Sequence, residues 1–403
     1  MISVEDALGR ITGAFSPLPS VEVSLVEALD RALAEDVRAA VSHPPADVSA
    51  MDGYAVRAED VAQVPVSLLV AGEAPAGGAY EGEVAPGQAV RIFTGGTVPQ
   101  GANAIVIQEN TERGGDTVTV VKSAGVGTYI RRWGQDFEAG EVGLKAGRRL
   151  TPRDIAFAAA MNLSHLKVRR KPRIAVLSTG DELVPPGEAP GPNQIPGSNG
   201  PTLAAFVASC GGEAVDLGIA PDDKKALAVL AAGAKDCDLL VTSGGVSVGD
   251  HDIVRDALGE CGLEVDFWGV AMRPGKPLLF GHVAHVPFLG FPGNPGSTLV
   301  CAVVYLRPAI DAMLGIGDGD AGEMTARLAC DLEANDERQD HMRVSLSQDA
   351  EGNLTAAPFL RQDSAMISIL SKADGLLIRP PLAPAAKAGD PATVIPLVGR
   401  WGW

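Results

Sequence analysis

Residues 172–316 alternate short apolar runs with segments of helical periodicity, and this alternation restricts the fold more than any other feature of the chain. Four apolar runs, each followed by a loop and a helix-like segment, are RIAVLST, EAVDLGI, DLLVTS and PFLGF. The helices are expected near 201–210, 222–234, 253–261 and 297–314. Strands and helices that alternate at this spacing form a mostly parallel sheet with helices on both faces. We therefore predict a multidomain chain whose α/β domain spans 172–316.

Three further modules are predicted from the remaining sequence. Amphipathic spacing predicts two helices within 1–42, and a Thr-Pro start predicts a third near 151–162, so residues 1–42 and 137–171 are assigned to a helical linking domain. Between them, short Val- and Ile-rich runs cut by glycine and proline predict a small inserted β-rich domain over 43–136. Alternating strands after Gly315 predict a C-terminal β-barrel over 317–403.

Composition limits the partners of the chain. The formal net charge of −17 repels phosphodiester backbones and anionic lipid, so we expect neither a nucleic-acid nor a membrane partner. The first ten residues lack the basic start and apolar run of a signal peptide. The longest apolar run, Leu299 to Leu306, is too short to cross a bilayer. We expect a cytoplasmic protein in which any anionic ligand needs a locally basic pocket.

Three of the predicted strands end in loops of small and polar residues. These loops are STGDEL at 178–183, TSGGVSVGDHD at 242–252 and FPGNPGST at 291–298. Ligands of open parallel sheets bind beyond the carboxyl ends of the strands. The three loops are therefore expected to meet at one crevice.

The loop at 242–252 has the composition of a phosphate-binding loop. Gly244 and Gly245 allow the backbone to approach a ligand closely, and Ser243 and Ser247 offer hydroxyl donors. The alternative is a tight strand-to-helix turn, in which glycine is the usual residue.

Two other segments also favour an anion. The helix that starts near Ser297 directs backbone N–H groups and a positive helix end toward the crevice, while Pro292 and Pro295 stiffen the preceding loop. In MRPGKP, Arg273 and Lys276 flank a Pro-Gly turn, and two cations at this spacing suit phosphate or molybdate. A simple strand end and an exposed basic turn remain the alternatives.

Carboxylates follow the same strand ends. Asp181 and Glu182 lie in the first loop, and Asp250 and Asp252 lie in the second. A magnesium ion takes oxygen ligands, so Mg²⁺ is the expected cofactor, with Glu182 and Asp252 as the favoured ligands. Some of these acids could instead cap the following helices. Acids outside the α/β domain could join the site only through domain or subunit packing.

Seven motifs in fixed order identify a family resemblance. They are PPADVSAMDGYAV, RIFTGGTVPQGANAIV, STGDEL, NQIPGSNG, TSGGVSVGDHD, MRPGKP and FPGNPGS. With these motifs the chain resembles the MoeA-type molybdopterin molybdenumtransferases, which include the E domain of gephyrin, from about residue 3 to about residue 397. The run ANDERQDHMR and the QDSA segment depart from the family pattern.

The resemblance implies a molybdopterin-binding α/β domain within an elongated homodimer whose active site is shared between subunits. The implied reaction inserts molybdenum from molybdate into adenylylated molybdopterin with magnesium, releases AMP and forms molybdenum cofactor. The enzyme of the preceding step, molybdopterin adenylyltransferase, is an implied partner. Three rival interpretations of the chain remain: an enzyme that adenylylates the pterin, a scaffold protein, and a paralogue that handles tungstate or is inactive.

The resemblance also implies functional residues. Glu182 and Asp252 resemble the magnesium carboxylates. Residues implied to be required for catalysis are Asp52, Thr94, Asp136, Glu182, Asp222 and Lys276. Residues implied to contact the pterin, its phosphates or molybdate are Ser198, Asn199, Ser243, Gly244, Gly245, Ser247, Arg273, Lys276, Pro292, Pro295, Ser297, Arg343 and Ser364.

Overall fold

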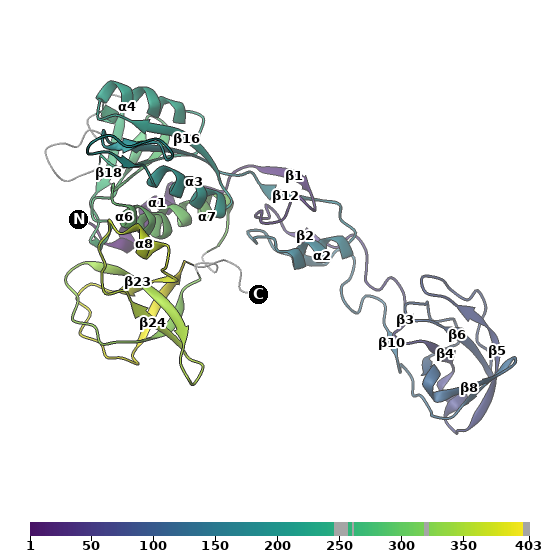
Figure 1. Cartoon of the computed structure of the whole chain (residues 1–403). Coiled ribbons are helices and arrows are strands. Elements are labelled where there is room, and N and C mark those ends of the chain that lie inside the picture. The colour runs from purple at the N-terminus through teal and green to yellow at the C-terminus, as the bar shows by residue number, and fades with distance from the viewer. Residues whose placement is uncertain (246–256, 260–261, 318–321, 398–403) are drawn as a thin grey trace.

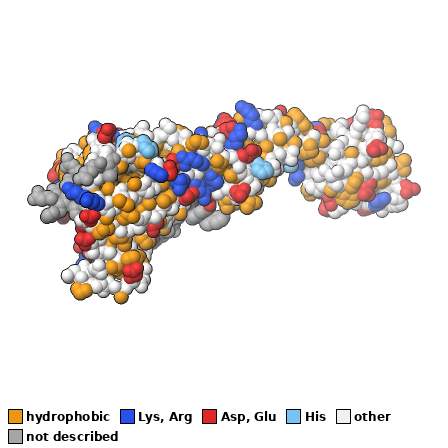
Figure 2. Space-filling model, turned by 90° about the horizontal axis from the view of Figure 1, so that it is seen from above, with side chains coloured by type: hydrophobic (Ala, Val, Ile, Leu, Met, Phe, Trp, Pro, Cys, Tyr) orange, Lys and Arg blue, Asp and Glu red, His pale blue; other side chains and the backbone are white. Residues whose placement is uncertain are grey.

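The computed structural model describes residues 1–245, 257–259, 262–317 and 322–397. The molecule is elongated, with an α/β domain and a C-terminal β-barrel at one end and a small β module at the other (Figure 1). A linking unit lies between them. Seen from above, Lys and Arg side chains gather over the middle of the same long outline (Figure 2).

The α/β domain is built on a six-stranded sheet in the order β16-β13-β17-β21-β20-β18. The first four strands are parallel, and β20 and β18 add an antiparallel edge. Their bounds are β13 Arg173–Thr179, β16 Glu213–Ala220, β17 Leu239–Ser243, β18 Leu263–Trp268, β20 Leu279–Val283 and β21 Val286–Phe291. The predicted mostly parallel sheet is confirmed.

Helices cover both faces of this sheet because successive strand residues point to opposite sides. Ile174 and Val176 of β13 face a core shared with α1, Val4–Gly13, α3, Asn199–Ser209, and a long helix. That helix consists of α6, Pro295–Cys301, a π turn, Ala302–Leu306, and α7, Arg307–Leu314. The alternate residues, Ala175 and Leu177, face α4, Lys224–Ala231, and its 3-10 extension, Ala232–Ala234. The helix expected near 253–261 lies largely outside the described residues.

The first 42 residues differ from the prediction of two amphipathic helices. The first helix exists as α1, but it packs on the α/β sheet rather than on the linking unit. The second, expected around 25–33, is wrong: β1, Ser20–Ser24, is followed by turns. The Ala28, Leu29 and Arg31 amides make local turn bonds, but the Leu25, Asp30 and Leu33 amides donate to distant carbonyls of Ser164, Leu150 and Arg148, so the turns do not continue as a regular helix.

The linking unit is formed by residues 20–42, which precede the β module, together with residues 137–171, which follow it. β1 pairs with β12, His165–Arg169, and β2, Val37–Arg38, pairs with β11, Val142–Leu144. The predicted helix near 151–162 is confirmed as α2, Pro152–Ala160, which begins with a capping box between Thr151 and Asp154. Residues from 28–39 and 137–168 share one apolar core.

The β module carries a six-stranded sheet in the order β7-β4-β6-β5-β9-β8 with an apolar cluster on each face. Its strands are β3 Val48–Ser49, β4 Gly53–Val56, β5 Val66–Ala74, β6 Gln88–Ile92, β7 Ala104–Ile107, β8 Thr111–Gly114, β9 Thr117–Val120 and β10 Ile130–Arg131, with 3-10 turns Ala58–Val61 and Gln108–Asn110. The predicted inserted β module is confirmed.

The C-terminal domain is a closed barrel, as predicted. Five strands follow the order β23-β24-β22-β26-β25, and β25 pairs back onto β23. Their bounds are β22 Met324–Leu328, β23 Gln339–Gln348, β24 Leu354–Pro358, β25 Gly375–Arg379 and β26 Pro391–Pro396, with a short helix α8, Ile367–Leu370. A two-residue strand of the α/β domain, β19, Met272–Arg273, adds to β23 and joins the two domains.

One helix among the described residues is long and apolar enough to cross a membrane. It contains the run from Leu299 to Leu306, which by itself is too short to do so. It spans Pro295–Leu314, 20 residues, with a mean hydropathy of 1.4, and 72% of its apolar window is buried inside the fold. A helix of the protein core has the same composition, so its apolar character is explained by packing.

Candidate functional site

Three strand ends and the start of α3 meet at one crevice. The Asn199 Nδ2 group donates to Ser243 Oγ at 2.7 Å and to the Gly293 carbonyl at 2.7 Å. Ser243 Oγ lies 3.3 Å from Thr298 Oγ1. Because β13, β17 and β21 are neighbouring parallel strands, their carboxyl ends lie at one edge of the sheet. The predicted meeting is found for the described parts of the three loops, while residues 246–252 of the second loop lie outside them.

The crevice floor is made of closely packed backbone. Gly244 has φ 99°, and a Cβ built on it would lie 2.5 Å from the Thr179 carbonyl oxygen. Gly245 also has positive φ, 67°. The hydroxyls of Thr179 and Thr242 are buried and have no hydrogen-bond partner among the described residues. Glycine is thus required here by packing as well as being suited to a close-lying ligand.

Other predicted contacts of the crevice have structural roles in its walls. The Ser198 carbonyl accepts from the Thr202 hydroxyl at 2.8 Å at the start of α3. The Pro292 carbonyl accepts from Thr298 Oγ1 at 2.7 Å, and Pro295 occupies the first turn of α6. Ser247, Asp250 and Asp252 lie outside the described residues.

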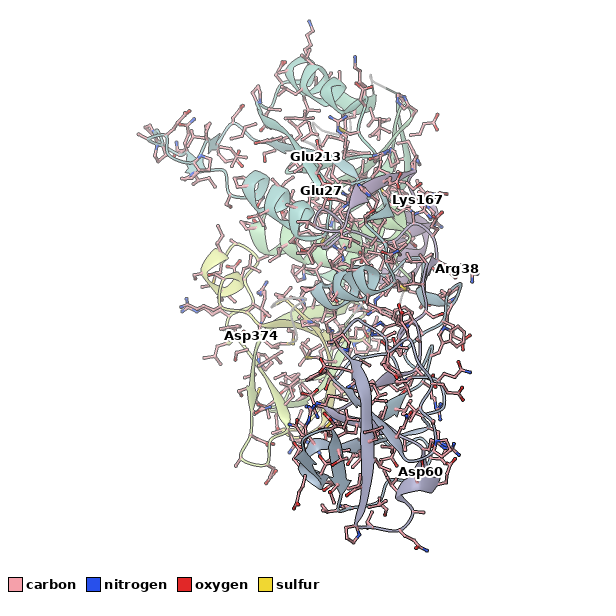
Figure 3. The ribbon with its side chains drawn as sticks, turned by 90° about the vertical axis from the view of Figure 1, so that its right-hand side faces the viewer. Glu27, Arg38, Asp60, Lys167, Glu213 and Asp374 are labelled. Atoms are coloured by element: carbon pink, nitrogen blue, oxygen red, sulfur yellow. The ribbon has the colours of Figure 1, made fainter. Side chains whose placement is uncertain are left out.

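A carboxylate cluster lies at the ends of β13 and β16. The Asp222 amide donates to Asp181 Oδ1 at 2.9 Å. Partial burial, followed by the negative charges of Asp181 and Glu182, raises the pKa of Asp222. Asp181 and Glu182 also line an open pocket with residues 191–194, on the loop between β14, Leu183–Val184, and β15, Ile195–Pro196. This loop projects from the α/β domain in Figure 3.

Within the described ranges, no group of three or more His, Cys, Asp or Glu side chains is arranged to hold a metal ion. Asp181, Glu182 and Asp222 nevertheless supply oxygen donors, and their mutual repulsion is reduced when a divalent cation binds. The chemistry of the donor set therefore fits magnesium.

The start of α6 faces a buried arginine of the barrel. A Cβ built on Gly296 would lie 3.2 Å from Arg343 Nη1, and the Gly296 amide donates to the Ser364 carbonyl at 2.6 Å. Asn294 Nδ2 donates to Ser364 Oγ at 3.0 Å, and Ser297 is buried in the first turn. Sequence reasoning predicted Ser297, Arg343 and Ser364, but it could not show that one barrel strand would face one helix, and it missed Gly296 and Asn294.

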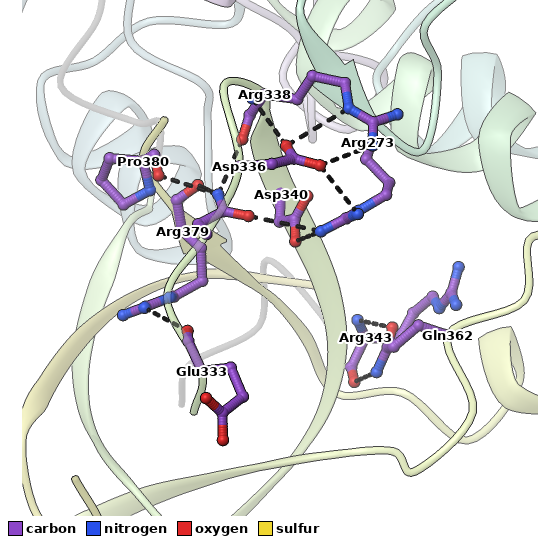
Figure 4. A network of polar contacts seen from close by, with 10 residues as sticks. Arg273, Glu333, Asp336, Arg338, Asp340, Arg343, Gln362, Arg379 and Pro380 are labelled. Carbon is purple, nitrogen blue, oxygen red and sulfur yellow. Dashed lines mark hydrogen bonds and ion pairs between the residues drawn. The ribbon is translucent and has the colours of Figure 1, made fainter. Parts of the chain in front are cut away.

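Arg343 is only 1% exposed, yet its Nε, Nη1 and Nη2 atoms have no hydrogen-bond partner in the described part of the chain. Burial lowers the pKa of Arg343 from its usual value. Its backbone is fixed by Gln362, which accepts from the Arg343 amide at 2.9 Å and donates to its carbonyl at 3.0 Å (Figure 4). Gln362 was missed from the sequence. A buried cation with unused donors points to an anionic ligand.

The MRPGKP turn separates its two cations. Arg273 forms ion pairs with Asp340 and, at 3.3 Å, with Asp336 (Figure 4). The hydrogen bond to Asp340 raises the pKa of Arg273. Lys276 is exposed and forms no ion pair with any residue that the structure describes. The structure therefore leaves Lys276 available to an anion, whereas it commits Arg273 to carboxylates of the barrel.

Asp52 and Thr94 lie in the β module, which is at the opposite end of the molecule from the crevice (Figure 1), and Asp136 lies where this module joins the linking unit. The amide and the hydroxyl of Thr94 both donate to Asp52 Oδ1 at 2.8 Å. These bonds, the one from the Thr94 amide first, lower the pKa of Asp52. The Asp136 amide donates to the His43 carbonyl at 3.0 Å. One chain thus forms the Asp52–Thr94 pair but does not bring it to the crevice.

The fold and the crevice define an α/β protein with anion-binding features, joined to a β-barrel. Three family profiles match it: the MoeA N-terminal region (domain I and II) over residues 2–162, a probable molybdopterin binding domain over 175–312, and the MoeA C-terminal region (domain IV) over 325–397.

Relatives of known name match most of the chain. Molybdopterin molybdenumtransferase 2 of Mycobacterium tuberculosis is 40% identical over 89% of this chain and 90% of its own. The molybdopterin molybdenumtransferase of Bacillus subtilis is 32% identical over 94% and 90%. A crystal structure of the MoeA molybdopterin biosynthesis protein from Pyrococcus horikoshii has a TM-score of 0.85 at 27% identity, covering 98% of this chain and 99% of its own. The chain belongs to the MoeA family of molybdopterin molybdenumtransferases.

Proposed function

We propose that this enzyme inserts molybdenum from molybdate into adenylylated molybdopterin, releasing AMP and forming molybdenum cofactor. The observation that carries the proposal is Arg343, a buried guanidinium that faces the start of α6 and whose nitrogen atoms have no hydrogen-bond partner among the residues described. Family membership supplies the reaction, and the crevice supplies the anion-binding groups.

Molybdate is bound between the two domains in this proposal. Arg343 and Ser364 donate to the oxyanion from the barrel domain, and Ser297 donates from α6. Lys276 lies on a turn that packs against this helix, since a Cβ built on Gly275 would lie 2.8 Å from Cys301 Sγ. Lys276 supplies a second positive charge. In a desolvated pocket such charge-assisted bonds are stronger than in water.

The pterin phosphates bind at the strand ends. Ser243, Gly244 and Gly245 provide a hydroxyl and close backbone, and Asn199 orients Ser243 through its 2.7 Å hydrogen bond. No side chain acts as a covalent nucleophile. Catalysis consists of holding the two substrates together and stabilising the charge that develops as the pyrophosphate is cleaved.

Magnesium completes the site in this proposal. Glu182 would be the ligand among the described residues, with Asp181 and Asp222 adding negative charge beside it, and the predicted second ligand, Asp252, lies outside the described residues. When bound, the ion supplies charge neutralisation at the pyrophosphate. The raised pKa of Asp222 comes first from partial burial and then from the negative charges of Asp181 and Glu182, and a bound cation would relieve that repulsion, which supports the assignment.

The working assembly is proposed to be a cytoplasmic homodimer. Asp52, Thr94 and Asp136 lie far from the crevice of their own chain, and an elongated shape allows them to reach the crevice of a second copy (Figure 1). The adenylylated substrate comes from the preceding adenylyltransferase, which is the proposed upstream partner.

The test is AMP release by the purified full-length chain from adenylylated molybdopterin, with magnesium, in the presence and absence of molybdate. Release should depend on molybdate and decrease strongly in Arg343→Met. Release that is indifferent to molybdate would refute the proposal. Consumption of ATP with unmodified molybdopterin would instead indicate the preceding adenylylation step.

A further inference from the structure

The ribbon formed by β19 and β23 has two faces with different chemistry. Met272 is paired with Gln339, and Arg273 is paired with Asp340. Directly paired residues share a face, and successive residues alternate between faces. Arg273 and Asp340 therefore lie on one face, and Met272, Gln339 and Arg343 lie on the other.

The contacts on the two faces agree with this alternation. On the first face, Arg273 Nη2 donates to Asp340 Oδ2. On the second face, the Tyr305 hydroxyl of the long helix donates to Met272 Sδ at 3.4 Å, and Arg343 approaches the start of the same helix. Arg273 and Arg343 thus leave the ribbon in opposite directions and cannot both hold one small oxyanion.

Asp340 depends on Arg273. Asp340 is 8% exposed, its Oδ2 is bound by Arg273, and its Oδ1 has no hydrogen-bond partner among the described residues. Without the arginine it would be a buried carboxylate with no hydrogen-bonded cation and only the more distant charge of Arg338, which is strongly unfavourable. Asp336, held by Arg338 at 2.7 Å, adds a second acceptor on the exposed side (Figure 4).

This pair lies at the junction of the two domains. β19 belongs to the α/β domain, and Arg343 follows Asp340 by three positions on the same barrel strand. We infer that Arg273 is a positioning residue: by holding Asp340 it fixes β23 so that Arg343 faces Gly296 and Ser364, and Arg273 is not itself an oxyanion ligand. The inference deepens the proposed function and rests on it for the identity of the ligand.

The test compares Arg273→Met, Asp340→Asn and the double variant, with Arg338→Met as the matched control. Arg338→Met removes a cation from the same network and leaves the Arg273–Asp340 pair. Each full-length protein is titrated calorimetrically with sodium molybdate alone, and the KM values for molybdate and adenylylated pterin are measured by AMP release. Thermal melts verify folding, and Asp340→Ala replaces Asp340→Asn if the latter does not fold.

Each single variant should weaken molybdate binding about tenfold, as loss of a positioning partner commonly does. The KM for the pterin should stay unchanged, the double variant should bind no more weakly than Arg273→Met, and Arg338→Met should match the unmodified protein. If Arg273→Met weakens binding while Asp340→Asn leaves it unchanged or tighter, Arg273 is a ligand and the inference is overturned. Unchanged binding in both variants overturns it equally.

A readout without substrate separates this inference from the proposed function. Hydrogen exchange of the β23 amides should be faster in Arg273→Met and Asp340→Asn than in Arg338→Met, whether or not the protein releases AMP. Failure of molybdate-dependent AMP release with altered exchange would reject the function alone. Unchanged exchange would reject the positioning role.

Discussion

Replacing Arg343 with Met should stabilise the free protein and abolish its response to molybdate. The guanidinium is 1% exposed and leaves three nitrogen atoms without hydrogen-bond partners in the described chain. A buried unsatisfied polar group costs roughly 1–3 kcal/mol, more when it is charged, and methionine retains much of the apolar packing. The Gln362 bonds remain because they involve only the Arg343 backbone. We expect the free energy of unfolding to rise by about 1–3 kcal/mol.

Urea unfolding with and without molybdate measures both effects. Molybdate at a hundredfold excess over its Kd should stabilise the unmodified protein by about 2.7 kcal/mol and the variant not at all. Arg327→Met serves as the control, since Arg327 is a barrel arginine that donates to the Gly389 carbonyl at 3.2 Å. If Arg343→Met were less stable than the unmodified protein without molybdate, Arg343 would be a structural residue and the oxyanion site would lose its main support.

Three further predictions concern the crevice and the β module. The raised pKa of Asp222 means that its ionised form is disfavoured in the folded state, so the free energy of unfolding falls as pH rises through the raised pKa. Asp222→Asn should remove this fall when unfolding is measured against pH. The same variant should bind magnesium more weakly. Gly244→Ala places a Cβ 2.5 Å from a backbone carbonyl at φ 99° and should cost about 1–3 kcal/mol in urea unfolding, whereas Gly114→Ala, with open space, should be neutral. Thr94→Val should raise the pKa of Asp52, measured by carboxyl NMR, yet leave it below its usual value because the Thr94 amide still donates; an unchanged pKa would contradict the assigned cause.

The sequence predicted the features that depend on local pattern. The strands of the α/β sheet were readable because each is a short apolar run followed by a glycine-rich loop, and adjacency of parallel strands then placed Ser243 and Thr298 together. The expected helix around 25–33 is wrong because the Leu25, Asp30 and Leu33 amides bond to distant carbonyls, and hydrophobic periodicity carries no information on such bonds. The pairing of β19 with β23 cannot be predicted from sequence periodicity either. The sequence therefore grouped Arg273 with Lys276 and did not indicate that Arg273 binds Asp340.

The two arginines of the domain junction explain how an acidic chain can select an oxyanion. Arg273 is about half exposed and neutralised by Asp336 and Asp340, so it adds little positive potential to the crevice. Among the described residues Arg343 has no hydrogen-bonded carboxylate, although the charge of Asp363 acts on it, and its guanidinium is shielded from water, so its charge is weakly screened. A surface with a net charge of −17 repels anions at long range, and the attraction must therefore arise at contact distance. We therefore expect the Kd for molybdate to change little with salt concentration, because salt screens exposed charges far more than a buried one.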